Sequence, residues 1–93
     1  MTYKLIIKTE AELDIAHALE WYASQKSGLE LDFLNAIEET LAVIERTPKL
    51  FQLRYRNIRV VFTKRFPYGI HYTIEKNQVF VHAVLNTSRA SKM

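Results

Sequence analysis

The chain opens with a short alternation of apolar and polar residues and then changes to a helical period. Residues 3–8 (YKLIIK) alternate, which predicts a β-strand. The next apolar residues are spaced three or four positions apart or adjacent, at Ala11, Ile15, Ala18, Leu19 and Tyr22. This spacing predicts an amphipathic helix with one apolar face. Thr9 and Glu12 have the spacing of a capping box, so we expect Thr9 to cap this helix.

A polar link at residues 24–28 (SQKSG) separates this helix from a second one. Ser27 and Glu30 repeat the capping-box spacing at its start. The apolar stripe of the second helix consists of Leu31, Leu34, Ile37, Leu41 and Ile44. The helix should end at Thr47-Pro48, because a residue before proline is displaced from the helical region. Two helices joined by so short a link predict an antiparallel hairpin.

The second half of the chain changes to a period of two residues. In residues 57–66 (NIRVVFTKRF) one side of the predicted strand carries Ile58, Val60, Phe62 and Phe66. The other side carries Arg59 and Arg65. Because successive side chains of a strand point to opposite faces, we expect both arginines to face away from the helices, toward solvent.

A turn and two more strands complete the pattern. Pro67 and Gly69 in the sequence PYG predict a turn, with Pro67 fixing φ and Gly69 permitting a positive φ. Residues 70–75 (IHYTIE) alternate, which points His71 away from the helices. Residues 79–86 (VFVHAVLN) are apolar on both sides, as is typical of a central strand.

The element order β-α-α-β-β-β predicts an α+β fold, with the helical hairpin packed on one face of a mostly antiparallel sheet. The 93 residues suit one domain, 1–93, and an apolar fraction of 48% argues against disorder. There is no cysteine, which excludes disulfides and thiolate metal sites. No apolar run is long enough to span a bilayer, and we expect a cytoplasmic protein without a membrane partner.

Charge is divided unevenly along the chain. Residues 9–47 carry a formal charge of −7 and residues 48–93 carry +8, within a total of +3. Such asymmetry indicates a surface for an anionic partner. Exposed strands also carry lysine and arginine simply to stay soluble, so this second explanation remains open.

The ordered set of segments resembles the RelE/ParE superfamily of bacterial toxins, and the ParE branch in particular. The resemblance is carried by residues 3–15 (YKLIIKTEAELDI), 18–48 (ALEWYASQKSGLELDFLNAIEETLAVIERTP), Arg59 with 66–72 (FPYGIHY), and 79–89 (VFVHAVLNTSR). It implies a toxin of a type II toxin–antitoxin pair, with a cognate antitoxin as partner. ParE-like members inhibit DNA gyrase by binding, whereas RelE-like members cleave messenger RNA on the ribosome. The three histidines, at positions 17, 71 and 82, have no short ligand spacing and there is no glycine-rich phosphate loop, so we expect no metal and no cofactor.

The resemblance also points to individual residues. Arg59 matches a recurring arginine ahead of the aromatic hairpin, and Arg89 matches one after the last strand. The chain departs from the family at Asn86, where a histidine is common, and it lacks the C-terminal aromatic or histidine of many ribosome-dependent nucleases. As partner-binding residues we expect Arg59, Arg65, Trp21 and Arg89. Trp21 is included because it lies off the apolar stripe of the first helix and aromatics are enriched in binding hot spots.

Two alternatives to gyrase binding stay open. RNA cleavage without a metal needs a base, an acid and cations that stabilise the phosphate. The candidates for these roles are Arg59, Lys64, His71, His82 and Arg89. The histidines have no fixed spacing to a partner base, so they can equally be ordinary strand residues. The other alternative is an inactive family member that acts as an antitoxin-binding module.

Overall fold

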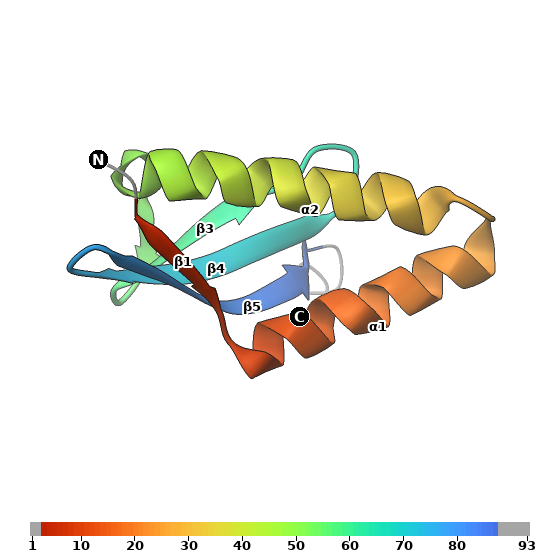
Figure 1. Ribbon diagram of the computed structural model, residues 1–93, viewed down its shortest axis with the longest axis horizontal. Helices are drawn as coiled ribbons and strands as arrows, with labels where there is room; N and C mark the ends of the chain where they lie inside the picture. Colours follow the sequence, from red (N-terminus) through yellow and green to blue (C-terminus); the bar gives the residue numbers. More distant parts are fainter. Residues whose placement is uncertain (1–2, 88–93) are drawn as a thin grey trace.

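The computed structural model describes residues 3–87, in which a helical hairpin covers one face of a five-stranded sheet (Figure 1). The elements in chain order are β1 (Lys4–Ile7), α1 (Thr9–Gln25), α2 (Leu29–Arg46), the 3-10 helix η1 (Pro48–Leu50), β2 (Leu53–Tyr55), β3 (Ile58–Phe62), β4 (Tyr68–Glu75) and β5 (Gln78–Asn86). The strand order is β1-β5-β4-β3-β2, and only the pairing of β1 with β5 is parallel. The predicted α+β fold is confirmed, with β2 as an additional short strand.

The core lies between the helices and the sheet. Its fully buried side chains include Phe33, Ile37 and Ile44 of α2 and Tyr72 of β4. The predicted apolar stripes of both helices supply most of the helical side, and burying such stripes is the main favourable term in folding. Leu31 is the exception, because it is 59% exposed near the start of α2.

Neither helix begins with the predicted capping box. The N-cap of α1 is Lys8, and its side chain makes no capping hydrogen bond. The N-cap of α2 is Gly28 and not the predicted Ser27. Gly28 has the left-handed conformation, with φ of 90°, which glycine adopts more readily than other residues. The acidic half of the predicted box is present, because the Gly28 N–H donates to Glu30 Oε1 at 3.1 Å.

The facing of β3 is the reverse of the prediction. Arg59 pairs with Tyr72 and Val61 pairs with Ile70, and both partners are fully buried on the helix side. Cross-strand partners share a face of the sheet, so Arg59 points toward the helix side. Phe62, predicted to be inside, is 52% exposed. Because β3 is apolar on both sides, its alternation does not decide which side is covered.

The connection between β3 and β4 also differs from the predicted turn. The positive φ occurs at Arg65, at 73°, whereas Gly69 lies within β4. Gly69 is required there for space, since a methyl group in its place would lie 2.9 Å from Val60 Cγ1. The turn is closed by Thr63, whose N–H donates to the Tyr68 carbonyl and whose hydroxyl donates to the Phe66 carbonyl, both at 2.9 Å.

Neither helix in residues 3–87 is both long enough and apolar enough to cross a membrane.

Candidate functional site

The face of the sheet opposite the helices, called here the outer sheet face, carries both candidate histidines. The register places Ile58, Val60, Phe62, His71, Thr73, Phe80, His82 and Ala83 on this face. The outward direction predicted for His71 is confirmed. No helix within residues 3–87 covers this face (Figure 1).

Each of these two histidines has a hydroxyl neighbour. His71 Nδ1 lies 3.0 Å from the Tyr55 hydroxyl, and His82 Nε2 lies 2.8 Å from the Thr73 hydroxyl. Burial lowers the pKa of His71, and the negative charge of Asp14 opposes that change in part. A lowered pKa favours the neutral imidazole, which can accept a proton as a base. The outer sheet face therefore holds two groups with acid–base capacity, both engaged by neighbouring side chains.

Arg59 is held by the segment that follows α2. Its guanidinium donates to the Phe51 carbonyl at 2.7 Å, and the Tyr72 hydroxyl donates to the Pro48 carbonyl at 2.6 Å. Burial raises the pKa of Tyr72 to about 12, and the charge of Arg59 acts in the opposite direction. These two bonds attach η1 to the sheet. The predicted solvent-facing position of Arg59 is thus wrong, while a role in partner binding stays a prediction.

The structure brings Trp21 and Arg65 to the same end of the molecule. Trp21 is 54% exposed and packs edge-on against Tyr22, with ring centroids 5.0 Å apart. Tyr22 packs on Phe66 at 5.1 Å, and the guanidinium of Arg65 lies 5.3 Å from the Phe66 ring. The two predicted partner-binding residues therefore flank one aromatic pair.

One further exposed side chain, Asp32, extends this region, which we call the hairpin-end surface (Trp21, Asp32 and Arg65). Asp32 Oδ2 lies 3.7 Å from Arg65 Nη2, with both side chains largely exposed, so the ion pair contributes little to stability. Leu31, beside Asp32, was predicted to be core and was missed as a surface residue. The buried face of α2 passes through Phe33, Ala36 and Ile37, and the helical period of 3.6 residues puts Leu31 on the opposite side.

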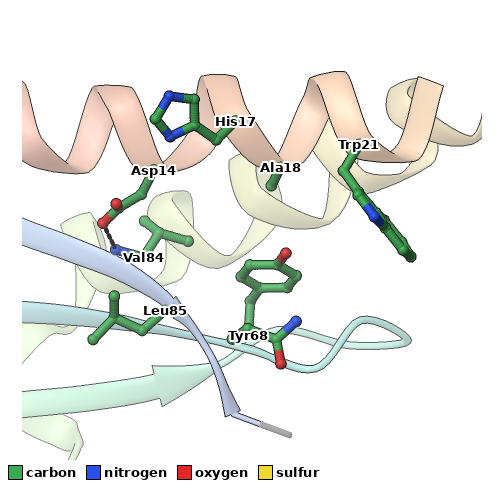
Figure 2. A pocket seen from close by; sticks show the side chains of 8 residues that line it. Asp14, His17, Ala18, Trp21, Tyr68, Val84 and Leu85 are labelled. Atoms are coloured by element: carbon green, nitrogen blue, oxygen red, sulfur yellow. Dashed lines mark hydrogen bonds between the residues drawn. The ribbon is translucent and has the colours of Figure 1, made fainter. Parts of the chain in front are cut away.

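A groove runs between α1 and the end of β5, and we call it the α1 groove. Its volume is about 570 Å³, and its lining residues are Asp14, His17, Ala18, Trp21, Tyr68, Val84, Leu85 and Asn86. The Val84 N–H donates to Asp14 Oδ2 at 2.9 Å, which attaches α1 to β5. Figure 2 shows the Tyr68 ring rising toward the helix, Trp21 at one end and His17 directed away from the strands.

A smaller groove lies on the other side of the molecule, between α2 and β3. We call it the edge groove, and its lining residues are Glu39, Thr40, Val43, Phe51, Val61, Phe62 and Lys64. Its volume is about 260 Å³. Lys64, a nuclease candidate from the sequence, is exposed and lines this groove rather than the outer sheet face near the histidines.

The candidate residues are therefore divided among separate regions. His71 and His82 share the outer sheet face, Trp21 and Arg65 share the hairpin-end surface, and Arg59 belongs to neither. Arg89 lies outside the described residues. Within residues 3–87, no three histidine or acidic side chains lie close enough together to hold a metal ion.

Comparisons with known protein families and solved structures agree with one another. The family described as the ParE toxin of the type II toxin–antitoxin system parDE matches residues 5–91. The fold is similar to a chain of the chromosomal ParDE system from P. aeruginosa, with a TM-score of 0.79 and 12% identity, covering 91% of this chain and 96% of that one. It is also similar to a double mutant of E. coli toxin RelE in the free state, with a TM-score of 0.57 and 20% identity, covering 99% and 90%. A search of curated proteins finds no significant match.

Proposed function

The chain belongs to the ParE toxin family and is a toxin of the type II toxin–antitoxin class, and from this premise we propose that it inhibits DNA gyrase by binding. The observation that carries the proposal is the extent of the family match. It spans residues 5–91 and so includes both α-helices and all five strands, except for Lys4 at the start of β1. Gyrase as the target implies action in the bacterial cytoplasm.

The hairpin-end surface supports a binding mechanism. It combines an exposed tryptophan and a cation on a packed base, because Trp21 contacts Tyr22 and Arg65 contacts Phe66 of the buried Tyr22–Phe66 pair. Aromatic and arginine side chains on a fixed support are the residues that dominate binding energy at protein interfaces. We propose that this surface contacts the target.

A supercoiling assay tests the proposal directly. Purified toxin is added to gyrase and relaxed plasmid, and in parallel to ribosomes translating a defined message. We expect loss of supercoiling with the message left intact. Cleavage of the message at defined positions with normal supercoiling would reject gyrase inhibition.

One observation favours the alternative of ribosome-dependent cleavage of messenger RNA. His71 and His82 lie on the same open sheet face, and Arg54 and Lys8 lie on aromatic rings there, 5.5 Å from Phe62 and 5.8 Å from Phe80. Imidazoles and cations on one surface are groups that RNA cleavage uses. Under this alternative, removing one of the histidines lowers cleavage by at least about 100-fold. If neither assay shows an effect, the inactive antitoxin-binding module is the remaining function.

A further inference from the structure

The last strand leads the chain directly to the wall of the α1 groove. Residues 84–86, at the end of β5, line this groove. The next residue, Thr87, donates its N–H to the Pro67 carbonyl at 2.7 Å, and Pro67 precedes Tyr68 of the same lining. Residues 88–93 follow, and six residues span at most about 20 Å. The continuation of the chain therefore starts at the groove and has the length to cross it.

The lining of the α1 groove combines aromatic rings with a carboxylate. Trp21 is 54% exposed at one end of the groove, and the Tyr68 ring rises toward α1 (Figure 2). Asp14 lies two helical turns before Trp21, about 10 Å along the axis of α1. A guanidinium group binds the face of a tryptophan ring and is attracted by a nearby carboxylate. The groove thus has the chemistry of a site for an arginine side chain.

The charges favour the chain's own continuation as the occupant of the groove. Residues 88–93 contain two cations, Arg89 and Lys92, and no acidic residue. Helix α1 contains no lysine or arginine, and its acidic residues are Glu10, Glu12, Asp14 and Glu20. Opposite charges attract over this range. Because the segment is attached to the end of β5, the attraction acts at a high effective concentration.

The other surfaces near the end of β5 carry positive charge. The connection between β3 and β4 contains Lys64 and Arg65. On the outer sheet face, Lys8 lies over one aromatic ring and Arg54 over another. Like charges disfavour the approach of a basic segment to either surface. Residues 88–93 are therefore directed toward α1.

We propose that residues 88–93 fold back over the α1 groove and place the guanidinium of Arg89 on the Trp21 ring. Arg89 is three residues beyond Asn86, a distance of about 10 Å along an extended chain, so its side chain reaches the groove from the end of β5. The segment then covers part of Trp21, a residue of the hairpin-end surface, and competes with any partner that binds this side chain. The inference concerns the chain itself and does not depend on gyrase as the target.

Fluorescence quenching tests the contact at its aromatic side. Trp21 is the single tryptophan of the chain, so the emission reports on this ring alone. Acrylamide is the quencher because it is uncharged, and a change of charge on the protein does not attract or repel it. We expect Arg89→Glu to raise the quenching constant by about 1.5-fold or more, because the ring loses its cover. Arg56→Glu, the same change at an exposed turn residue outside the groove, should leave the constant unchanged. Equal quenching of the two variants would reject the proposal.

Salt tests the electrostatic part of the contact in the unchanged protein. At about 1 M salt the Debye length falls to about 3 Å, which screens the attraction between the segment and α1. We expect the quenching constant of the full chain to rise toward that of Arg89→Glu, while the variant itself changes little. An equal rise in both proteins would show that salt acts on Trp21 without the segment, and would overturn the proposal.

A spin label locates the segment independently of Trp21 fluorescence. The chain has no cysteine, so Ser91→Cys allows one nitroxide label in the full-length protein. In nuclear magnetic resonance spectra we expect the label to broaden the amide signals of His17 and Trp21, on α1, more than that of Phe80, on the outer sheet face. Stronger broadening at Phe80 would overturn the proposal.

A mixing experiment separates binding within one chain from binding between copies. Labelled protein without isotope enrichment is mixed with unlabelled, isotope-enriched protein. We expect no broadening at His17 or Trp21 in this mixture, because each groove is covered by its own chain. Broadening there would show that the segment of a second copy occupies the groove, and would reject the proposed intramolecular contact.

Discussion

Arg59 and Tyr72 lie opposite each other on β3 and β4, and each donates a hydrogen bond to a carbonyl of the segment that follows α2. The acceptors are the Phe51 carbonyl for Arg59 and the Pro48 carbonyl for Tyr72, at 2.7 and 2.6 Å. Buried carbonyls left without a donor are costly, so the two side chains stabilise the turn from helix to sheet. An arginine that the sequence suggests for partner binding is therefore part of the fold.

Removing Arg59 should destabilise the protein. We expect Arg59→Ala to lower the free energy of unfolding by about 1–3 kcal/mol, because the Phe51 carbonyl loses a charged donor. Urea unfolding followed by circular dichroism measures the change. Arg56→Ala, at an exposed turn residue, is the matched control and should change stability by less than about 0.5 kcal/mol. Equal stability of the two variants would show that the Arg59 bond contributes nothing.

Tyr72 should make the protein sensitive to alkali. Its pKa is about 12 in the folded state and 10.0 in the reference state, so the unfolded chain releases the proton first as the pH rises. Stability contributed below pH 10 is then lost between about pH 10 and 12, by about 1.4 kcal/mol per unit. Tyr72→Phe should be less stable at pH 8 but lose less between pH 9 and 12. Parallel losses in both proteins would contradict this assignment.

Gly69 should tolerate no side chain. Its φ is ordinary for a strand, so the obstacle to Gly69→Ala is the contact of the new methyl group with Val60 and the Phe62 ring. Overpacking of this kind costs about 1–3 kcal/mol. Val60→Ala removes the closest atom, and the double variant should therefore be more stable than the sum of the two single changes predicts. Thermal unfolding of the four proteins measures the coupling, and strict additivity would refute the contact.

Trp21 and Arg65 should matter for the target and not for the fold. We expect Trp21→Ala and Arg65→Ala each to weaken gyrase inhibition by at least about tenfold, since both present exposed side chains on a rigid base. Leu13→Ala, at an exposed leucine of the same helix as Trp21, is the control and should inhibit normally. The inhibitory concentration in the supercoiling assay is the measurement. Full inhibition by both variants would show that the toxin contacts gyrase through another surface.

The helices and most strands could be predicted because each has one dominant period. The predicted stripe of α2 is correct at Ile37, Leu41 and Ile44. The buried face also includes Phe33, which lies beside that stripe, and it excludes Leu31. β3 has apolar residues on both faces, so its facing depends on what packs against it, which local sequence does not record. β2 is three residues long and entirely exposed, so it has no buried face for a pattern to reveal.

The candidate site was predictable to the same extent. His71 follows from alternation in β4, whose inner residues are unambiguous. The inward direction of Arg59 could not be predicted in this way. Its hydrogen-bond acceptor, the Phe51 carbonyl, lies eight residues away in a bend that no sequence period predicts. The edge groove joins α2, Phe51 and β3, and such a surface exists only after the elements have packed.

The bond between Asp14 and Val84 joins residues 70 positions apart, and β1 pairs with β5 across a similar distance. The first strand and first helix thus depend on the last strand for their support. During synthesis, these contacts of β1 and α1 form only after β5 has emerged, because contacts distant in sequence require closure of a long loop. A nascent chain therefore completes this domain only after β5 (Gln78–Asn86) has been synthesised, and a chain interrupted before β5 lacks the strand that supports β1 and α1.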